Sequence, residues 1–186
     1  MRAARVRRAL ALGIAAALAL VIAACGGGGG DGKTDRAADV EVLNGILGRQ
    51  LAAVEAYGRA LPALRDAADL AAVRSFRLQE QEHSDATTKT IRGLDGEADP
   101  PAEEIPSGPI RTRRQAFEFL YELESATIDA ELNAVGRLTI GWPRPLIASM
   151  AANQAQHLVL IRQALGAGSF ETVPEAFETG ETPAPR

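Results

Sequence analysis

The chain has two histidines among its 186 residues, and each follows a potential oxygen ligand by three positions. His83 comes three residues after Glu80, and His157 comes three residues after Gln154. Residues i and i+3 share one face of an α-helix, so each pair can present two side chains to the same metal ion. The carboxylate of Glu is a charged ligand, whereas the amide of Gln offers only a neutral carbonyl oxygen. The two pairs therefore predict related sites of unequal ligand strength.

A single offset relates these two pairs, because 154 − 80 and 157 − 83 are both 74. The same offset places Gln50 opposite Glu124. In addition, 80 − 50 and 154 − 124 are both 30, which brings the paired side chains to one level across each helical hairpin. We therefore expect one helical hairpin that occurs twice, with its histidines at equivalent positions.

The elements that must position these side chains are helices. Across residues 38–166, apolar residues recur at steps of three and four, and we find no convincing alternation of the kind that strands show. Breaks fall at 65–69 (RDAAD), at 141–145 (GWPRP) and across the long segment 93–110. An extended chain covers about 3.3 Å per residue, so the long segment can cross the whole bundle. Short, long and short connections predict an all-α four-helix bundle with one long crossover between the second and third helices.

The inward faces of these helices carry six polar residues: Gln50, Glu80, His83, Glu124, Gln154 and His157. Glu131 also faces inward, but seven residues correspond to about 10.5 Å along a helix axis. We therefore expect Glu131 to lie too far from Glu124 to join the same centre, and to reach a bundle end or an arginine. Tyr57, Tyr121 and Trp142 are expected to pack in the core and the turns.

The pattern of these faces resembles the ferritin-like superfamily, in which two helices each supply a Glu and the other two each supply Glu-x-x-His. The stretches LYELESATIDAEL, MAANQAQHLVLIRQALG and PEAFETG are similar to bacterial ferritin-like domain proteins. This resemblance implies a ferritin-like bundle with metal ligands at Glu80, His83, Glu124 and His157, and degenerate ligand positions at Gln50 and Gln154. It further implies iron or another divalent transition metal as cofactor, and iron oxidation or oxidant scavenging as the activity.

Two of the four carboxylates that this family pattern expects are amides in this chain. A di-iron centre would therefore leave about two positive charges without compensation in a core of low dielectric constant. One alternative is a single-metal site at Glu80, Glu124 and His157, with Gln154 as a weak partner and His83 displaced. The other is a metal-free core in which Gln and His side chains hydrogen-bond to the two carboxylates. The sequence leaves both alternatives open.

The N-terminal segment predicts export and membrane attachment. Four arginines precede the apolar run ALALGIAAALALVIAA, which is shorter than a membrane span and ends directly before the only cysteine, Cys25. The junction IAAC resembles the lipobox of bacterial lipoproteins, and CGGGGGDGK resembles the tether that follows one. We expect a signal peptide (1–24), a lipidated Cys25 in a flexible tether (25–37), the bundle (38–167) and a Pro- and Glu-rich tail (168–186). An uncleaved N-terminal anchor is the alternative.

The charge balance bounds the partners of the expected mature chain. Loss of residues 1–24 leaves 20 − 4 = 16 basic against 24 acidic side chains, a formal charge of −8. Nucleic acid selects basic surfaces, so we expect none as a partner. We expect the protein in the bacterial cell envelope, outside the cytoplasm and attached to the membrane, as a monomer or a dimer. A metal-free bundle that serves as a structural or interaction module there is the alternative to a metal-binding protein.

Overall fold

The computed structural model describes residues 31–168. The chain divides into two units, residues 1–35 and residues 36–186. Within the first unit, residues 31–35 are described, and they are helical. The predicted signal peptide, Cys25 and nearly all of the predicted tail lie outside the described residues. No helix between residues 31 and 168 combines the length and the hydropathy that a membrane span requires.

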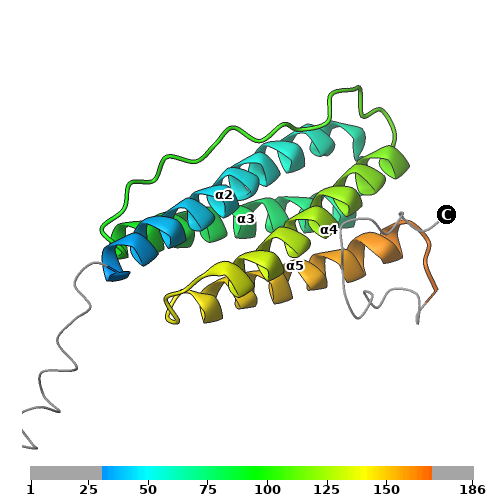
Figure 1. The fold of residues 1–186 in the computed structure, drawn as a ribbon. Helices are drawn as coiled ribbons and strands as arrows, with labels where there is room; N and C mark the ends of the chain where they lie inside the picture. Colours follow the sequence, from blue (N-terminus) through cyan, green and yellow to red (C-terminus); the bar gives the residue numbers. More distant parts are fainter. Residues whose placement is uncertain (1–30, 169–186) are drawn as a thin grey trace, which may run out of the picture. The chain divides into compact units, whose positions relative to one another are not determined.

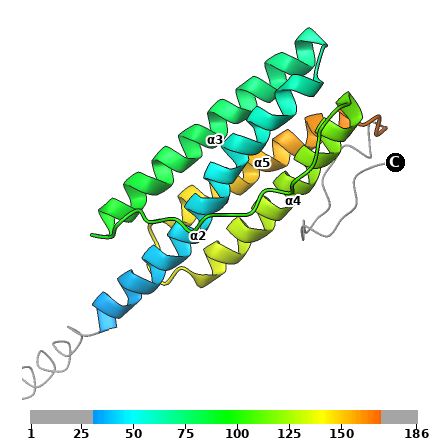
Figure 2. The same cartoon turned by 90° about the horizontal axis from the view of Figure 1, so that it is seen from above.

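Four long helices form the second unit. α2 extends over Asp31–Ala60 and leads into a short 3₁₀-helix, η1, at Leu61–Ala63; it is followed by α3 at Ala67–Gly93, α4 at Arg113–Arg137 and α5 at Arg144–Ala164. From Arg36 onward these helices lie side by side as a bundle, and the segment between α3 and α4 runs along its length (Figures 1 and 2). No described residue belongs to a strand. The predicted four-helix bundle with one long crossover is confirmed.

Side-chain caps determine where two of the helices begin. Asp66 accepts hydrogen bonds of 2.8 and 3.1 Å from two backbone N–H groups in the first turn of α3. Thr112 and Gln115 form a reciprocal capping box at the start of α4.

α2, in contrast, begins at Asp31, before the expected start at residue 38. The Ala and Arg residues from Arg36 on favour a helix.

Two clusters of buried apolar side chains fill the bundle. The first includes Tyr57, Phe76, Phe117, Leu158 and Ile161, and the second includes Leu43, Leu47, Ile91, Ile147 and Met150. Between them, α2 carries Gln50, α3 carries Glu80 and α5 carries Gln154, and all three side chains are fully buried. A polar layer therefore crosses the apolar core, and burial of such groups requires partners within the layer.

Buried and partly buried carboxylates connect the helices near their ends. Asp39, which is fully buried, accepts hydrogen bonds of 2.8 Å from the backbone N–H groups of both Thr139 and Ile140. These bonds attach α2 to the turn between α4 and α5. Asp69 of α3 accepts two hydrogen bonds from Arg113 of α4, at 2.5 and 2.9 Å. Together these contacts restrict how far the helices can shift relative to the polar layer.

The crossover between α3 and α4 is attached to α2. Asn44 donates to the carbonyl oxygen of Glu97 and accepts from the N–H of Asp99, each at 3.0 Å. One turn further along, a Cβ atom at Gly48 would lie 2.6 Å from the carbonyl oxygen of Pro101. Only glycine permits this close approach of the two backbones.

Candidate metal centre

Three buried side chains from three helices meet in the polar layer: Glu80 of α3, Glu124 of α4 and His157 of α5. Each offers one ligand atom, and these atoms all lie within 4.8 Å of one another. The Nδ1 atom of His157 is 2.9 Å from Oε1 of Glu124 and 3.8 Å from Oε1 of Glu80. We call these three residues the triad. Two carboxylates and one imidazole so close together match the ligands that a divalent transition metal takes from proteins.

Gln79 fixes the orientation of the His157 ring. Its Oε1 atom lies 2.6 Å from Nε2 of His157, and an amide oxygen can only accept a hydrogen bond. The proton of the neutral ring therefore resides on Nε2, and the lone pair of Nδ1 faces the two carboxylates. The ring of Phe76 stacks on the imidazole with centroids 4.1 Å apart. This is the tautomer that a metal ligand needs, held by a hydrogen bond on the opposite side of the ring.

Tyr57 contacts the triad directly. Its hydroxyl group donates a hydrogen bond to Oε1 of Glu124, and its side chain is fully buried. Tyr57 packs in the core as expected, and in addition its hydroxyl end reaches across to α4. Burial, followed by the negative charges of Glu124 and Glu80, raises the pKa of the Tyr57 phenol well above its usual value. The phenol therefore stays protonated and remains a donor.

The electrostatics of the triad favour a positive group between its members. Burial raises the pKa of Glu124, and the nearby charge of Glu80 adds to this, while the hydrogen bond from His157 opposes it. At 2.9 Å, the lone pair of Nδ1 and an ionised oxygen of Glu124 would repel each other. Either a proton or a cation must lie between these atoms. In a metal-free protein the triad therefore holds a proton at that position.

The two glutamines of the polar layer make different contacts. Gln154 donates through Nε2 to both carboxylate oxygens of Glu80, at 3.3 and 3.4 Å. Gln50 donates through Nε2 to Oε1 of Glu131 at 3.3 Å, and the same atom lies 3.4 Å from the sulfur of Met150. Gln154 thus adjoins the triad, whereas Gln50 lies beside Glu131.

Glu131 lies outside the triad, as expected, but its partner in the polar layer is Gln50 and not an arginine. The expectation considered only the separation of Glu124 and Glu131 along α4, and not the residues of α2 that face them. Tyr57 of α2 contacts Glu124, and Gln50, seven residues earlier on α2, contacts Glu131, seven residues later on α4. The two helices are antiparallel, so Glu131 has its partner on α2. Burial, together with the charge of Glu80, raises the pKa of Glu131 to about 9. Glu131 is therefore protonated at neutral pH and contributes no negative charge to the triad.

His83 lies at the margin of the triad. Its Nδ1 atom is 3.7 Å from Oε2 of Glu80, and its side chain is 13% exposed. Among the residues from 31 to 168, Nδ1 of His83 has no hydrogen-bond partner. Of the four residues that the sequence indicated as ligands, the structure brings Glu80, Glu124 and His157 together and leaves His83 outside the group.

The residues present fit one divalent cation better than two. Glu80 and Glu124 balance the charge of one such ion, and Oε2 of Glu124 accepts no hydrogen bond from any described residue. The amide oxygen of Gln154 is likewise without a donor within residues 31–168. The groups left to bind a second ion are two neutral amides and the protonated Glu131, none of which carries a negative charge. Its charge would be uncompensated in the core.

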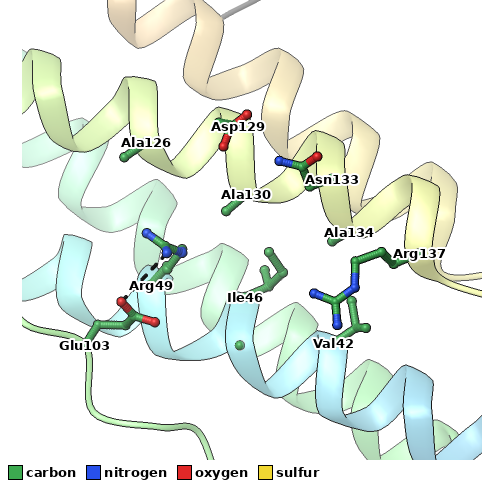
Figure 3. Close-up of a pocket in the computed structure, with 11 residues that line it drawn as sticks. Val42, Ile46, Arg49, Glu103, Ala126, Asp129, Ala130, Asn133, Ala134 and Arg137 are labelled. Carbon is green, nitrogen blue, oxygen red and sulfur yellow. Dashed lines mark ion pairs between the residues drawn. The ribbon is translucent and has the colours of Figure 1, made fainter. Parts of the chain in front are cut away.

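A separate surface pocket of about 440 Å³ lies between α2 and α4 (Figure 3). Its floor contains Ile46, Ala130 and Ala134, and Arg49 at its edge forms an ion pair of 4.0 Å with Glu103 of the crossover. No member of the triad lines this pocket. The pocket therefore does not give access to the candidate metal centre.

Comparisons with known proteins agree with this architecture. Residues 38–167 match the family described as "Ferritin-like domain". A ferritin-like, diiron-carboxylate protein from Bacillus anthracis str. Ames has a similar structure, with a TM-score of 0.62 and 17% identity over 71% of this chain and 98% of its own. A conserved hypothetical protein from Mycobacterium tuberculosis has a TM-score of 0.63 and 17% identity over 77% and 99% of the two chains. No curated protein matches the chain.

Proposed function

Because the chain belongs to the ferritin-like domain family, we propose that it binds one divalent transition metal, iron in the first place, at Glu80, Glu124 and His157. The observation that carries this proposal is the buried triad, whose three ligand atoms lie within 4.8 Å of one another. Its two carboxylates match the charge of one divalent ion. The metal would replace the proton that the triad otherwise holds between Nδ1 of His157 and Glu124.

Each neighbour of the triad has a role in this proposal. Gln79 keeps the proton of His157 on Nε2, so that Nδ1 is free to bind the metal. Tyr57 donates to Oε1 of Glu124 and orients that carboxylate. Gln154 holds both oxygens of Glu80. A bound iron ion would supply one-electron redox chemistry, and on that basis we propose iron oxidation or oxidant scavenging as the activity.

We also propose that the bundle is attached to a membrane through a lipid on Cys25, outside the cytoplasm. The support is the IAAC junction after a basic and apolar leader. In a bacterial host, the full-length protein should be recovered with the membranes, and Cys25→Ala should shift it to the soluble fraction. Recovery of both forms with the membranes would instead favour an uncleaved N-terminal anchor.

Metal analysis of residues 31–186 tests the metal proposal. The bundle corresponds to nearly the whole length of two solved chains, 98% and 99%, so we expect it to fold without the leader. After anaerobic loading with iron and removal of excess metal, we expect about one ion per chain. Glu124→Gln should abolish this binding. Glu122→Gln, an exposed position on the same helix, is the matched control and should retain it.

Three outcomes would contradict the proposal. No bound metal after loading would favour the alternative, a metal-free bundle that serves as a structural or interaction module in the envelope. About two ions per chain would show that the charge argument against a second ion is wrong. Loss of metal in both the Glu124→Gln and Glu122→Gln variants would mean that binding is not specific to the triad.

A further inference from the structure

The outer face of α3 carries an exposed leucine between two opposite charges. Leu78 is 66% exposed, more than any other large apolar side chain among the described residues. Arg74 precedes it by four positions and Glu82 follows it by four, and both are exposed. Residues four apart form one ridge along a helix. Neither Arg74 nor Glu82 has an ion-pair partner within residues 31–168.

A groove beside this ridge is apolar at its base. It has a volume of about 490 Å³. It is lined by Val54 of α2 and Leu61 of η1 on one side, and by Arg74, Arg77, Leu78 and Gln81 of α3 on the other. Arg77 is held in place, because its Nε atom donates to the carbonyl oxygen of Val54 at 3.0 Å. The guanidinium of Arg77 therefore forms part of the wall. The volume of the groove exceeds that of a leucine side chain.

We propose that two copies of this chain form a dimer through α3, with Leu78 of each copy in the α2–α3 groove of the other. The ridge is self-complementary. A two-fold axis that passes at Leu78 sets the two α3 helices antiparallel, and it places Arg74 of each copy against Glu82 of the other because 78 − 74 and 82 − 78 are both 4. Both ion pairs and both leucine contacts form at once.

The charges favour a second copy over a membrane surface. An anionic membrane attracts basic side chains and repels acidic ones. The face carries the acidic Glu82 and Asp85 beside the basic Arg74 and Lys89, so an anionic membrane would repel as many of its charges as it attracts. A second copy of the chain, in contrast, satisfies both signs. The proposal does not depend on metal binding, because Glu80 is two residues from Leu78, about 200° around the helix, and points into the core.

Sedimentation velocity on residues 31–186 tests the dimer. We expect a dimer whose dissociation constant rises about 100-fold or more in Leu78→Gln, because each of two leucines loses burial worth about tenfold or more in affinity. Leu132→Gln is the matched control, since Leu132 is also exposed, at 49%, but lies on α4. That control should associate as the parent does. A parent protein that stays monomeric up to about 1 mM would overturn the proposal.

A charge exchange provides the sharper test, because it distinguishes a specific interface from misfolding. Arg74→Glu and Glu82→Arg should each weaken the dimer, since like charges then face each other. The double variant should restore it, because the pairs re-form with reversed polarity. No restoration, with unchanged melting temperatures, would show that the two residues do not meet. Binding of a monomer to phosphatidylcholine–phosphatidylglycerol vesicles, lost in Leu78→Gln, would assign the face to a membrane and also overturn the proposal.

Discussion

Replacement of Glu131 by Gln should reduce the pH dependence of folding stability between pH 6 and 8 by about 2 to 3 kcal/mol. The pKa of Glu131 is about 9 in the folded protein and about 4.5 in the unfolded chain. Between these values the folded state holds one proton more than the unfolded state, so stability falls as pH rises. The slope for one such group is about 1.36 kcal/mol per pH unit. From pH 6 to pH 8 the loss is therefore about 2 to 3 kcal/mol.

Glu131→Gln has nearly the shape of the protonated acid, and its amide cannot ionise. It keeps an oxygen that accepts from Gln50, so the contact at 3.3 Å is retained. The free energy of unfolding should be measured by urea titration at pH 6 and pH 8, with EDTA present so that no metal contributes. We expect the parent protein to lose about 2 to 3 kcal/mol more than the variant between these two conditions. Glu122→Gln, on the exposed face of α4, should behave like the parent.

Equal pH slopes in the parent and in Glu131→Gln would refute this reasoning. They would mean that Glu131 is ionised in the folded protein at neutral pH, with water or another cation in the polar layer. The argument against a second metal ion would then lose one of its premises. Glu124, whose pKa is also raised, is present in both proteins and so cancels in the comparison.

Three other changes have expected outcomes. Gln79→Leu should lower the metal affinity about 10- to 100-fold in a chelator competition, with little change in folding, because the tautomer of His157 is no longer fixed. The double variant Gln50→Glu, Gln154→Glu should raise the iron content from about one towards two ions per chain, because it restores the two missing carboxylates. Asp39→Ala should lower the free energy of unfolding in urea by about 2 to 4 kcal/mol, since two backbone donors at the α4–α5 turn lose their acceptor.

The fold could be predicted because it depends on features that are local in the sequence. The steps of three and four, the two short breaks and one long connection are sufficient to define a bundle and its order. The triad could be predicted in part. Glu80 and His157 belong to i, i+3 pairs, and Glu124 is related to Gln50 by the common offset. Their proximity follows once the hairpins are set at one level.

The missed residues depend on contacts between helices, which a single helical face does not reveal. Tyr57 and Glu131 were assigned by their positions along their own helices, whereas their partners lie on the opposite, antiparallel helix. Gln79 left a weaker signal. It directly precedes Glu80, and an amide, Asn153, directly precedes Gln154 at the same offset of 74. This repeated amide could have indicated Gln79 as the partner of His157, although Oδ1 of Asn153 has no hydrogen-bond partner among the described residues.

The crosswise contacts between α2 and α4 bear on how this sequence can evolve. Positions 50 and 124 are equivalent under the offset of 74 residues, and so are positions 57 and 131, yet the hydrogen bonds join 57 to 124 and 50 to 131. The residue tolerated at each position therefore depends on its hydrogen-bond partner, and not on the residue at the equivalent position. Among homologous sequences we expect residues 50 and 131 to covary, and residues 57 and 124 to covary. One contact pair, such as 57 and 124, can then retain a charged ligand while the other, 50 and 131, becomes electrically neutral.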